Sequence, residues 1–175
     1  MACAPTQTLG RSKTVCIDRG YYGPIAKPDF QRYCAPVPDD FRFIVKADGA
    51  VTQSSLRSGK NWLDSPQFLN AEYATRNIVA PYAEGLDQKA SVLLFQFPPV
   101  NAELRRQPTQ FAERLHDFVT ALPAGIRYAI EIRDAQLRRT LLHRIASTHA
   151  TAAAAAQPHG GSVIWSVNRA LELTS

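Results

Sequence analysis

Four short apolar segments recur along the chain, and their pattern predicts four β-strands. In residues 41–47, FRFIVKA, bulky apolar side chains alternate with the others, as in a strand that is buried on one face. Residues 91–97, SVLLFQF, are almost continuously apolar, which is typical of a strand covered on both faces. Shorter patterns at 14–18 and 127–133 complete the set.

Between these strands the apolar positions follow the 3.6-residue spacing of amphipathic helices. Ser65 is predicted to cap the longest helix, with Pro66 in its first turn. Pro81 is expected to kink that helix and Gly85 to end it. Thr109 is predicted to cap the next one. The predicted helices cover residues 29–33, 65–84, 109–122 and 135–147.

The alternation of strand and helix predicts the fold class. It is typical of βα units in a parallel sheet, so we expect an α/β protein. Residues 1–13 are polar and irregular, residues 14–147 form the predicted domain, and residues 148–175 are a low-complexity or divergent tail. SVIW at 162–165 is a further strand candidate, whereas the long polar segment 48–64 receives no element.

Composition places the chain among ordinary globular proteins of about one domain. It has 175 residues, of which 45% are hydrophobic and 20% charged. The longest unbroken apolar stretch, residues 152–156, is far shorter than the ~18 residues of a membrane helix. The first ten residues lack the apolar core of a secretory signal, and three cysteines do not form a disulfide framework. We therefore expect a cytoplasmic protein without a membrane partner.

The basic charge balance does not by itself indicate a nucleic-acid partner. Twenty Lys and Arg residues against fifteen Asp and Glu give a net charge of +5. The basic residues are spread along the chain and are not interleaved with aromatic residues, as they are in many nucleic-acid binders. A nucleic-acid partner is therefore not expected, and a weak accessory role through charge is kept only as an alternative.

Strand alternation collects polar residues at one end of the predicted sheet. The bulky apolar side chains of each strand are expected to pack on helices, so the other residues point to the opposite face. Late in each strand these residues are polar. Because the C-terminal ends of parallel strands form one edge, where ligands bind in such folds, we expect a site there. The residues are Asp18, Lys46, Gln96, Glu131 and Arg133.

This cluster has two interpretations. Lys46 and Arg133 can bind a phosphate or carboxylate, and Glu131 can serve as a general base, with Gln96 orienting a polar ligand. Alternatively, Glu131, Lys46 and Arg133 form a buried structural ion network. No motif indicates a metal or cofactor: the chain has no Cys-x-x-Cys, no His-x-x-x-His and no phosphate-binding glycine loop.

Four segments resemble the YecE-like family, also called domain of unknown function 72. They are TVCIDRGYYGP, FRFIVKA, LLFQFPP and LPAGIRYAIEIRD, and the resemblance covers about residues 14–142. It implies a TIM-type barrel of eight βα units, of which the four strands look like the second to the fifth. We therefore expect a partial barrel with about four parallel βα units, from a truncated and divergent member. Tyr22 matches a family tyrosine and joins the candidate ligand-binding residues.

Several positions depart from the family pattern and bear on catalysis. Cys16 stands where the family usually has Glu, and Asp18 replaces an Asn. Gln53 follows Thr52 where the family has His, Asp134 stands in place of another His, and Leu137 in place of a Trp. These changes remove a carboxylate and imidazoles, which are groups that can transfer protons. The resemblance implies no established activity, so whether the chain is an enzyme stays open. The alternative is an enzyme for a small anionic, sugar- or phosphate-like ligand.

Overall fold

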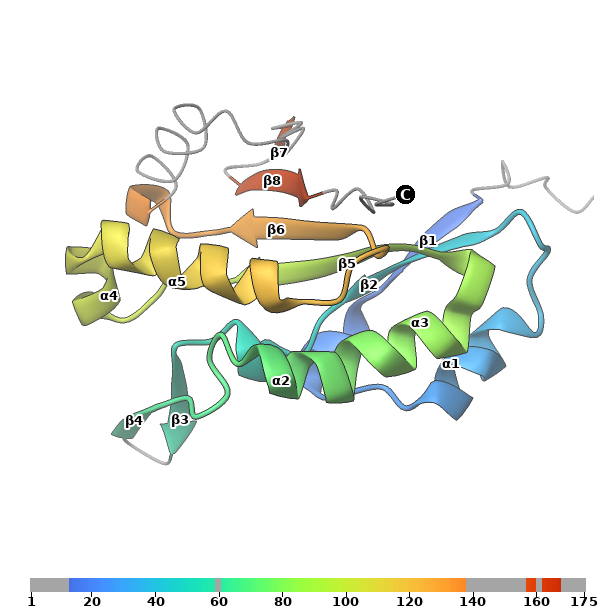
Figure 1. Cartoon of the computed structure of the whole chain (residues 1–175), viewed down its shortest axis with the longest axis horizontal. Coiled ribbons are helices and arrows are strands. Elements are labelled where there is room, and N and C mark those ends of the chain that lie inside the picture. Colours follow the sequence, from blue (N-terminus) through green and yellow to red (C-terminus); the bar gives the residue numbers. More distant parts are fainter. Residues whose placement is uncertain (1–12, 59–60, 138–156, 160–161, 168–175) are drawn as a thin grey trace, which may run out of the picture.

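The structure is a computed structural model that describes residues 13–58, 61–137, 157–159 and 162–167. Its centre is a six-stranded sheet in the order β1-β2-β5-β6-β8-β7 (Figure 1). The strands are β1 (Thr14–Ile17), β2 (Arg42–Lys46), β5 (Ala90–Phe97), β6 (Tyr128–Ile132), β7 (Gln157–His159) and β8 (Ser162–Val167).

The first four strands of this sheet are parallel, which confirms the α/β class and all four predicted strands. The candidate strand at 162–165 lies within β8, which runs antiparallel to both β6 and β7. Across the described residues the sheet is open, with β1 and β7 as its edges. The parallel strands are therefore consistent with part of a βα barrel, and the described residues do not close one.

Helices follow each parallel strand, and they match most of the predicted ones. The prediction at 29–33 falls within the first helix, and residues 135–137 are helical, while the rest of the helix predicted at 135–147 lies outside the described residues. The helices are α1 (Lys27–Cys34), α2 (Ala71–Ala74), α3 (Ala80–Leu86), α4 (Ala102–Arg106) and α5 (Pro108–Ala121). Shorter turns are η1 (Asp18–Tyr22), η2 (Gly49–Val51), the π-helical η3 (Thr75–Val79) and η4 (Asp87–Lys89).

The predicted start of the long helix at Ser65 is wrong. The helix begins at Ala71, and the side chain of Asn70 caps it by accepting a hydrogen bond of 2.9 Å from the Tyr73 N–H. The Ser65 hydroxyl donates instead to the carbonyl of Ala50, 15 residues earlier. The Ser65 side chain, which the local sequence predicts to be a helix cap, is therefore used in a tertiary hydrogen bond.

The predicted cap at Thr109 is wrong as well. Helix α5 begins one residue earlier, at Pro108, whose missing N–H costs nothing in the first turn. Gln107 occupies the cap position without a side-chain hydrogen bond. The proline therefore fixes the start of the helix, and Thr109 lies inside it.

The sequence predicts a kink at Pro81, and the structure shows a change of helix type just before it. The five residues of η3 form a π-helical segment between α2 and α3, and Pro81 is the second residue of α3. Proline lacks an N–H and its ring crowds the carbonyl four residues earlier, and a π turn widens the backbone at such a place. The helical path then continues to Leu86, one residue past the predicted end at Gly85.

The polar segment 48–64 contains a hairpin that the sequence pattern did not predict. Strands β3 (Ser55–Ser58) and β4 (Asn61–Asp64) pair antiparallel and project from the body of the molecule (Figure 1). The Ser54 hydroxyl anchors the base of the hairpin by accepting from the backbone N–H of Asn101 at 3.1 Å. Trp62 and Leu63 are exposed. Because the hairpin buries little apolar surface, its sequence lacks the alternation of apolar and polar residues that predicts a strand.

The core lies between the sheet and the helices, on the face that strand alternation predicted. Phe95 is fully buried and meets Phe118 of α5 edge to face, with ring centroids 5.3 Å apart. Tyr82 of α3 and Phe30 of α1 close the core beneath β2 and β5. Within the described ranges, no helix is long and apolar enough to cross a membrane.

Candidate functional site

Strand register brings the predicted polar residues to one edge of the sheet. Gln96 near the end of β5 pairs in register with Glu131 on β6, and Lys46 at the end of β2 pairs with Leu94. Asp18 follows directly after β1, and Arg133 after β6. The structure thus places five of the six predicted site residues together at the C-terminal ends of the parallel strands.

A first ion pair joins Lys46 to Asp18, with Nζ 2.9 Å from Oδ1. The Lys46 side chain is 21% exposed and that of Asp18 63%, so the pair lies at the rim of the site. The hydrogen bond from Lys46 lowers the pKa of the Asp18 carboxyl, and one from the Cys16 thiol adds to this. Asp18 therefore stays ionised beside Lys46 at neutral pH.

A second cluster joins Glu131, Gln96 and Arg133. Glu131 is buried, and each of its carboxylate oxygens accepts a hydrogen bond. The Gln96 amide donates to Oε2, and Arg133 Nε donates to Oε1 at 3.0 Å. The Arg133 side chain is 51% exposed, and its two terminal nitrogens have no acceptor among the described residues. Within the described residues, Arg133 thus offers the four N–H groups of its two terminal nitrogens to a ligand.

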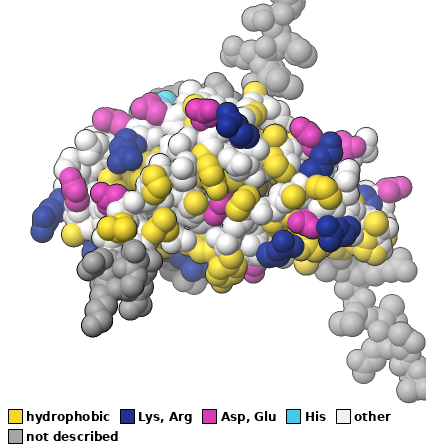
Figure 2. All heavy atoms as spheres, turned by 90° about the horizontal axis from the view of Figure 1, so that it is seen from below, with side chains coloured by type: hydrophobic (Ala, Val, Ile, Leu, Met, Phe, Trp, Pro, Cys, Tyr) yellow, Lys and Arg dark blue, Asp and Glu magenta, His cyan; other side chains and the backbone are white. Residues whose placement is uncertain are grey.

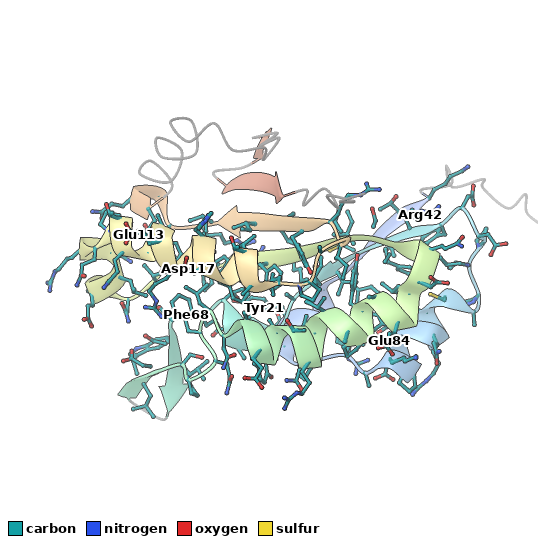
Figure 3. The ribbon with its side chains drawn as sticks, viewed as in Figure 1. Tyr21, Arg42, Phe68, Glu84, Glu113 and Asp117 are labelled. Atoms are coloured by element: carbon teal, nitrogen blue, oxygen red, sulfur yellow. The ribbon has the colours of Figure 1, made fainter. Side chains whose placement is uncertain are left out.

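Tyr22, the sixth predicted site residue, does not join this cluster. It is 87% exposed at the end of η1. Its neighbour Tyr21 is half-buried and hydrogen-bonds to the side chain of Gln53. In Figure 3, Arg42 marks the start of β2, and Tyr21 lies toward the opposite end of the strands. Tyr22 therefore stays a predicted ligand-binding residue, and Tyr21 is the more buried of the two tyrosines.

Asp134, which follows β6 by two residues, has clear structural partners. Asp134 is buried and accepts from the N–H groups of Gln136 and Leu137, so it caps the helical turn after β6. Its other oxygen accepts from Arg105 Nε at 3.1 Å. These bonds tie the end of β6 to α4, which holds the backbone that carries Arg133.

A comparison with family models identifies the family of the chain. A family model described as "Protein of unknown function DUF72" matches residues 9–170. The chain belongs to this family. The match extends past both ends of the segment 14–142 that carried the sequence resemblance. No curated protein and no solved structure matches the chain.

A cavity of about 10 Å³ lies beside Lys46, between the sheet and the helices, and is lined by Gly20, Asp48 and Tyr82 among others. That volume is space for about one water molecule. Among the described residues, no group of three or more His, Cys, Asp or Glu side chains could hold a metal ion.

Cys16 is exposed, yet its surroundings make it a poor nucleophile. Partial burial raises the pKa of its thiol to about 11, and the hydrogen bond and negative charge of Asp18 contribute to the increase. The thiolate is the reactive form. At pH 8 we expect alkylation by iodoacetamide to be about 100-fold slower than for a thiol with an ordinary pKa, measured in a variant whose Cys3 and Cys34 are serines.

Asp18→Asn is the matched control for this prediction. It removes the negative charge that disfavours the thiolate, so alkylation of Cys16 should become faster and its pH midpoint should move down. An unchanged midpoint in Asp18→Asn, or a native rate equal to that of an unstructured cysteine peptide, would contradict the assignment.

Proposed function

We propose that this DUF72 protein binds a small ligand through an oxyanion group, a phosphate or carboxylate, at the C-terminal ends of β2 and β6. The observation that carries the proposal is the half-exposed guanidinium of Arg133, whose terminal nitrogens are free of acceptors in the described part of the chain. A guanidinium fork fits two oxygens of such a group.

Lys46 supports the same site from β2. Its ammonium carries three donors, and the Asp18 carboxylate is its one ion-pair partner among the described residues. Asp18 and Glu131 balance the two cations, so the site has almost no net charge. The attraction for an anion therefore comes from directed hydrogen bonds over a short range, and we expect millimolar affinity for a simple oxyanion.

Glu131 is best understood as a positioning residue. Both of its oxygens accept hydrogen bonds, so it fixes the plane of Arg133 through one oxygen and the Gln96 amide through the other. A proton taken up by Glu131 would neutralise its carboxylate and weaken the charge-assisted hydrogen bond from Arg133. We therefore propose ligand binding as the function, and the assignment of Glu131 as a catalytic base stays a prediction.

The distribution of charge favours this small-ligand site over a nucleic-acid interface. On the face shown in Figure 2, basic and acidic side chains alternate and form no basic stripe. Several basic residues are held in ion pairs, such as Lys27 with Glu84 and Arg76 with Glu72. A nucleic-acid interface would need a continuous basic surface, and its affinity would fall steeply with salt.

Titration calorimetry with inorganic phosphate at low salt tests the proposal. The native chain should show saturable binding, and Lys46→Ala should weaken it about tenfold or more, because it removes a charged hydrogen-bond donor. Lys27→Ala is the matched control: Lys27 also pairs with a carboxylate at 2.9 Å, but on the surface between α1 and α3. Lack of saturable binding at tens of millimolar phosphate, or an equal loss in both variants, would reject the site.

A further inference from the structure

The side chain of Gln96 is buried at the strand ends, and its carbonyl oxygen has no partner in the described part of the chain. Gln96 is 6% exposed. Its Nε2 donates to Oε2 of Glu131, and no described residue donates a hydrogen bond to its Oε1. A buried carbonyl without a donor costs free energy, because it has lost its hydrogen bonds to water. The Gln96 carbonyl is therefore open to a donor that the described residues do not supply.

The Glu131 carboxylate fixes which way this amide points. An ionised carboxylate only accepts hydrogen bonds, so the amide turns its NH₂ group to Glu131 and its carbonyl oxygen to another direction. The other oxygen of Glu131 accepts from Arg133 Nε at 3.0 Å. One carboxylate and two hydrogen bonds thus link the two side chains, which places the Gln96 carbonyl oxygen within roughly 10 Å of the Arg133 guanidinium. Both groups are within the reach of one small ligand.

The cations on the two neighbouring strands leave this carbonyl unbonded. Gln96 lies on β5, between β2 and β6. Lys46 pairs in register with Leu94, two residues before Gln96, so the Lys46 and Gln96 side chains share one face of the sheet. Lys46 Nζ is ion-paired with Asp18, however, and Arg133 Nε also donates to a carboxylate. Each of these donors is thus directed to a stronger acceptor than an amide carbonyl.

We propose that the Gln96 carbonyl accepts a hydrogen bond from a hydroxyl group of the ligand whose oxyanion binds Lys46 and Arg133. This inference rests on the proposed function and deepens it by naming the substrate class. The donor is a neutral hydroxyl, because the positive charges of Lys46 and Arg133 repel an ammonium group.

A phosphate ester fits this set of groups better than a carboxylate does. The guanidinium fork of Arg133 takes two oxygens of an oxyanion, and a phosphate ester has a third oxygen for Lys46. A hydroxyl group a few atoms away from the phosphate can reach Gln96 at the same time. The substrate class is therefore a small hydroxylated phosphate ester, such as a polyol phosphate or a sugar phosphate.

The test compares glycerol phosphate with propyl phosphate, two esters of similar size that differ in their hydroxyl groups. Titration calorimetry measures the affinity of each ester for the native chain and for Gln96→Met, which keeps the length of the side chain and removes the amide. The native chain should bind glycerol phosphate about five- to tenfold more tightly than propyl phosphate, and in Gln96→Met this ratio should fall below about twofold. A loss of affinity that both esters share leaves the ratio unchanged, so a merely structural role of Gln96 would not move it.

Gln67→Met is the matched control. The Gln67 carbonyl already accepts a hydrogen bond, from Asn70 Nδ2 at 3.0 Å in the turn before α2, so this variant should keep the native ratio. Thermal unfolding is measured for each variant. If Gln96→Met does not fold, Gln96→Asn replaces it, because it keeps an amide and withdraws the carbonyl by one methylene group. The ratio should fall in that variant as well.

The outcomes separate this inference from the proposed function. If both esters bind, Lys46→Ala weakens both and the native ratio is close to one, the oxyanion site stands and the hydroxyl contact is wrong. A native preference that persists in Gln96→Met would also overturn the inference, because another group would then recognise the hydroxyl. If neither ester nor inorganic phosphate binds, both proposals fail.

Discussion

Gly20→Ala is expected to cost about 3 kcal/mol of folding free energy or more and to abolish phosphate binding. Gly20 is buried in η1, and a Cβ there would overlap the backbone carbonyl oxygen of Lys46. A backbone oxygen in a parallel strand cannot rotate away as a side chain can, so η1 must separate from β2. That movement would displace Asp18 from its ion pair with Lys46. Urea denaturation gives the loss of stability, and phosphate titration gives the loss of binding.

Gly125→Ala provides the control for this variant. Gly125 has a φ of 83°, and a Cβ there would meet nothing within 4 Å. Only the cost of a left-handed conformation remains, about 1 kcal/mol, and phosphate binding should be unchanged. A Gly20→Ala chain as stable as Gly125→Ala would show that η1 does not pack on the end of β2 as described.

Phe95→Ala is expected to lose about 3 to 5 kcal/mol of folding free energy. Phe95 is fully buried at the centre of β5, where its ring contacts Phe118 edge to face and lies 6.0 Å from the ring of Tyr128. Truncation removes these aromatic contacts and leaves a cavity between the sheet and α5. Because small domains have only about 5 to 15 kcal/mol of stability, this variant should be largely unfolded at moderate urea concentration.

Leu63→Ala tests whether that loss reflects burial. Leu63 is 56% exposed in the β3–β4 hairpin, so its truncation should change the free energy of unfolding by about 0.5 kcal/mol or less. The urea midpoint of each variant measures the difference. Similar losses for Phe95→Ala and Leu63→Ala would mean that the face of β5 assigned to the core is wrong.

The four parallel strands could be predicted from the sequence because each strand has its own pattern of apolar and polar residues. The alternation of FRFIVKA and the apolar run of SVLLFQF describe which faces are buried, and the structure confirms both. The same alternation placed Lys46, Gln96 and Glu131 on one face of the sheet, and the register of β2, β5 and β6 brings them to one edge. Periodicity is a local property, so a single chain is enough to reveal it.

Helix starts and irregular segments could not be predicted in the same way. Ser65 and Thr109 both have the chemistry of a cap, but a distant carbonyl engages the first, and Pro108 fixes a different start for the second. The hairpin at 55–64 buries too little apolar surface to leave a periodic pattern. In each case the deciding contact joins residues far apart in sequence or depends on one turn.

The α/β class, the four parallel strands, the membership in DUF72 and the presence of cations and carboxylates at the strand ends all follow from the amino-acid sequence. The pairing of those groups depends on the three-dimensional fold. It joined Asp18 to Lys46 and Arg133 to Glu131, and it left Tyr22 exposed at the end of η1. The physical reason is range: strand patterns arise from neighbours along the chain, whereas hydrogen-bond partners depend on how close separate segments pack, as Gly20 does on Lys46 and Gly49 on Tyr21.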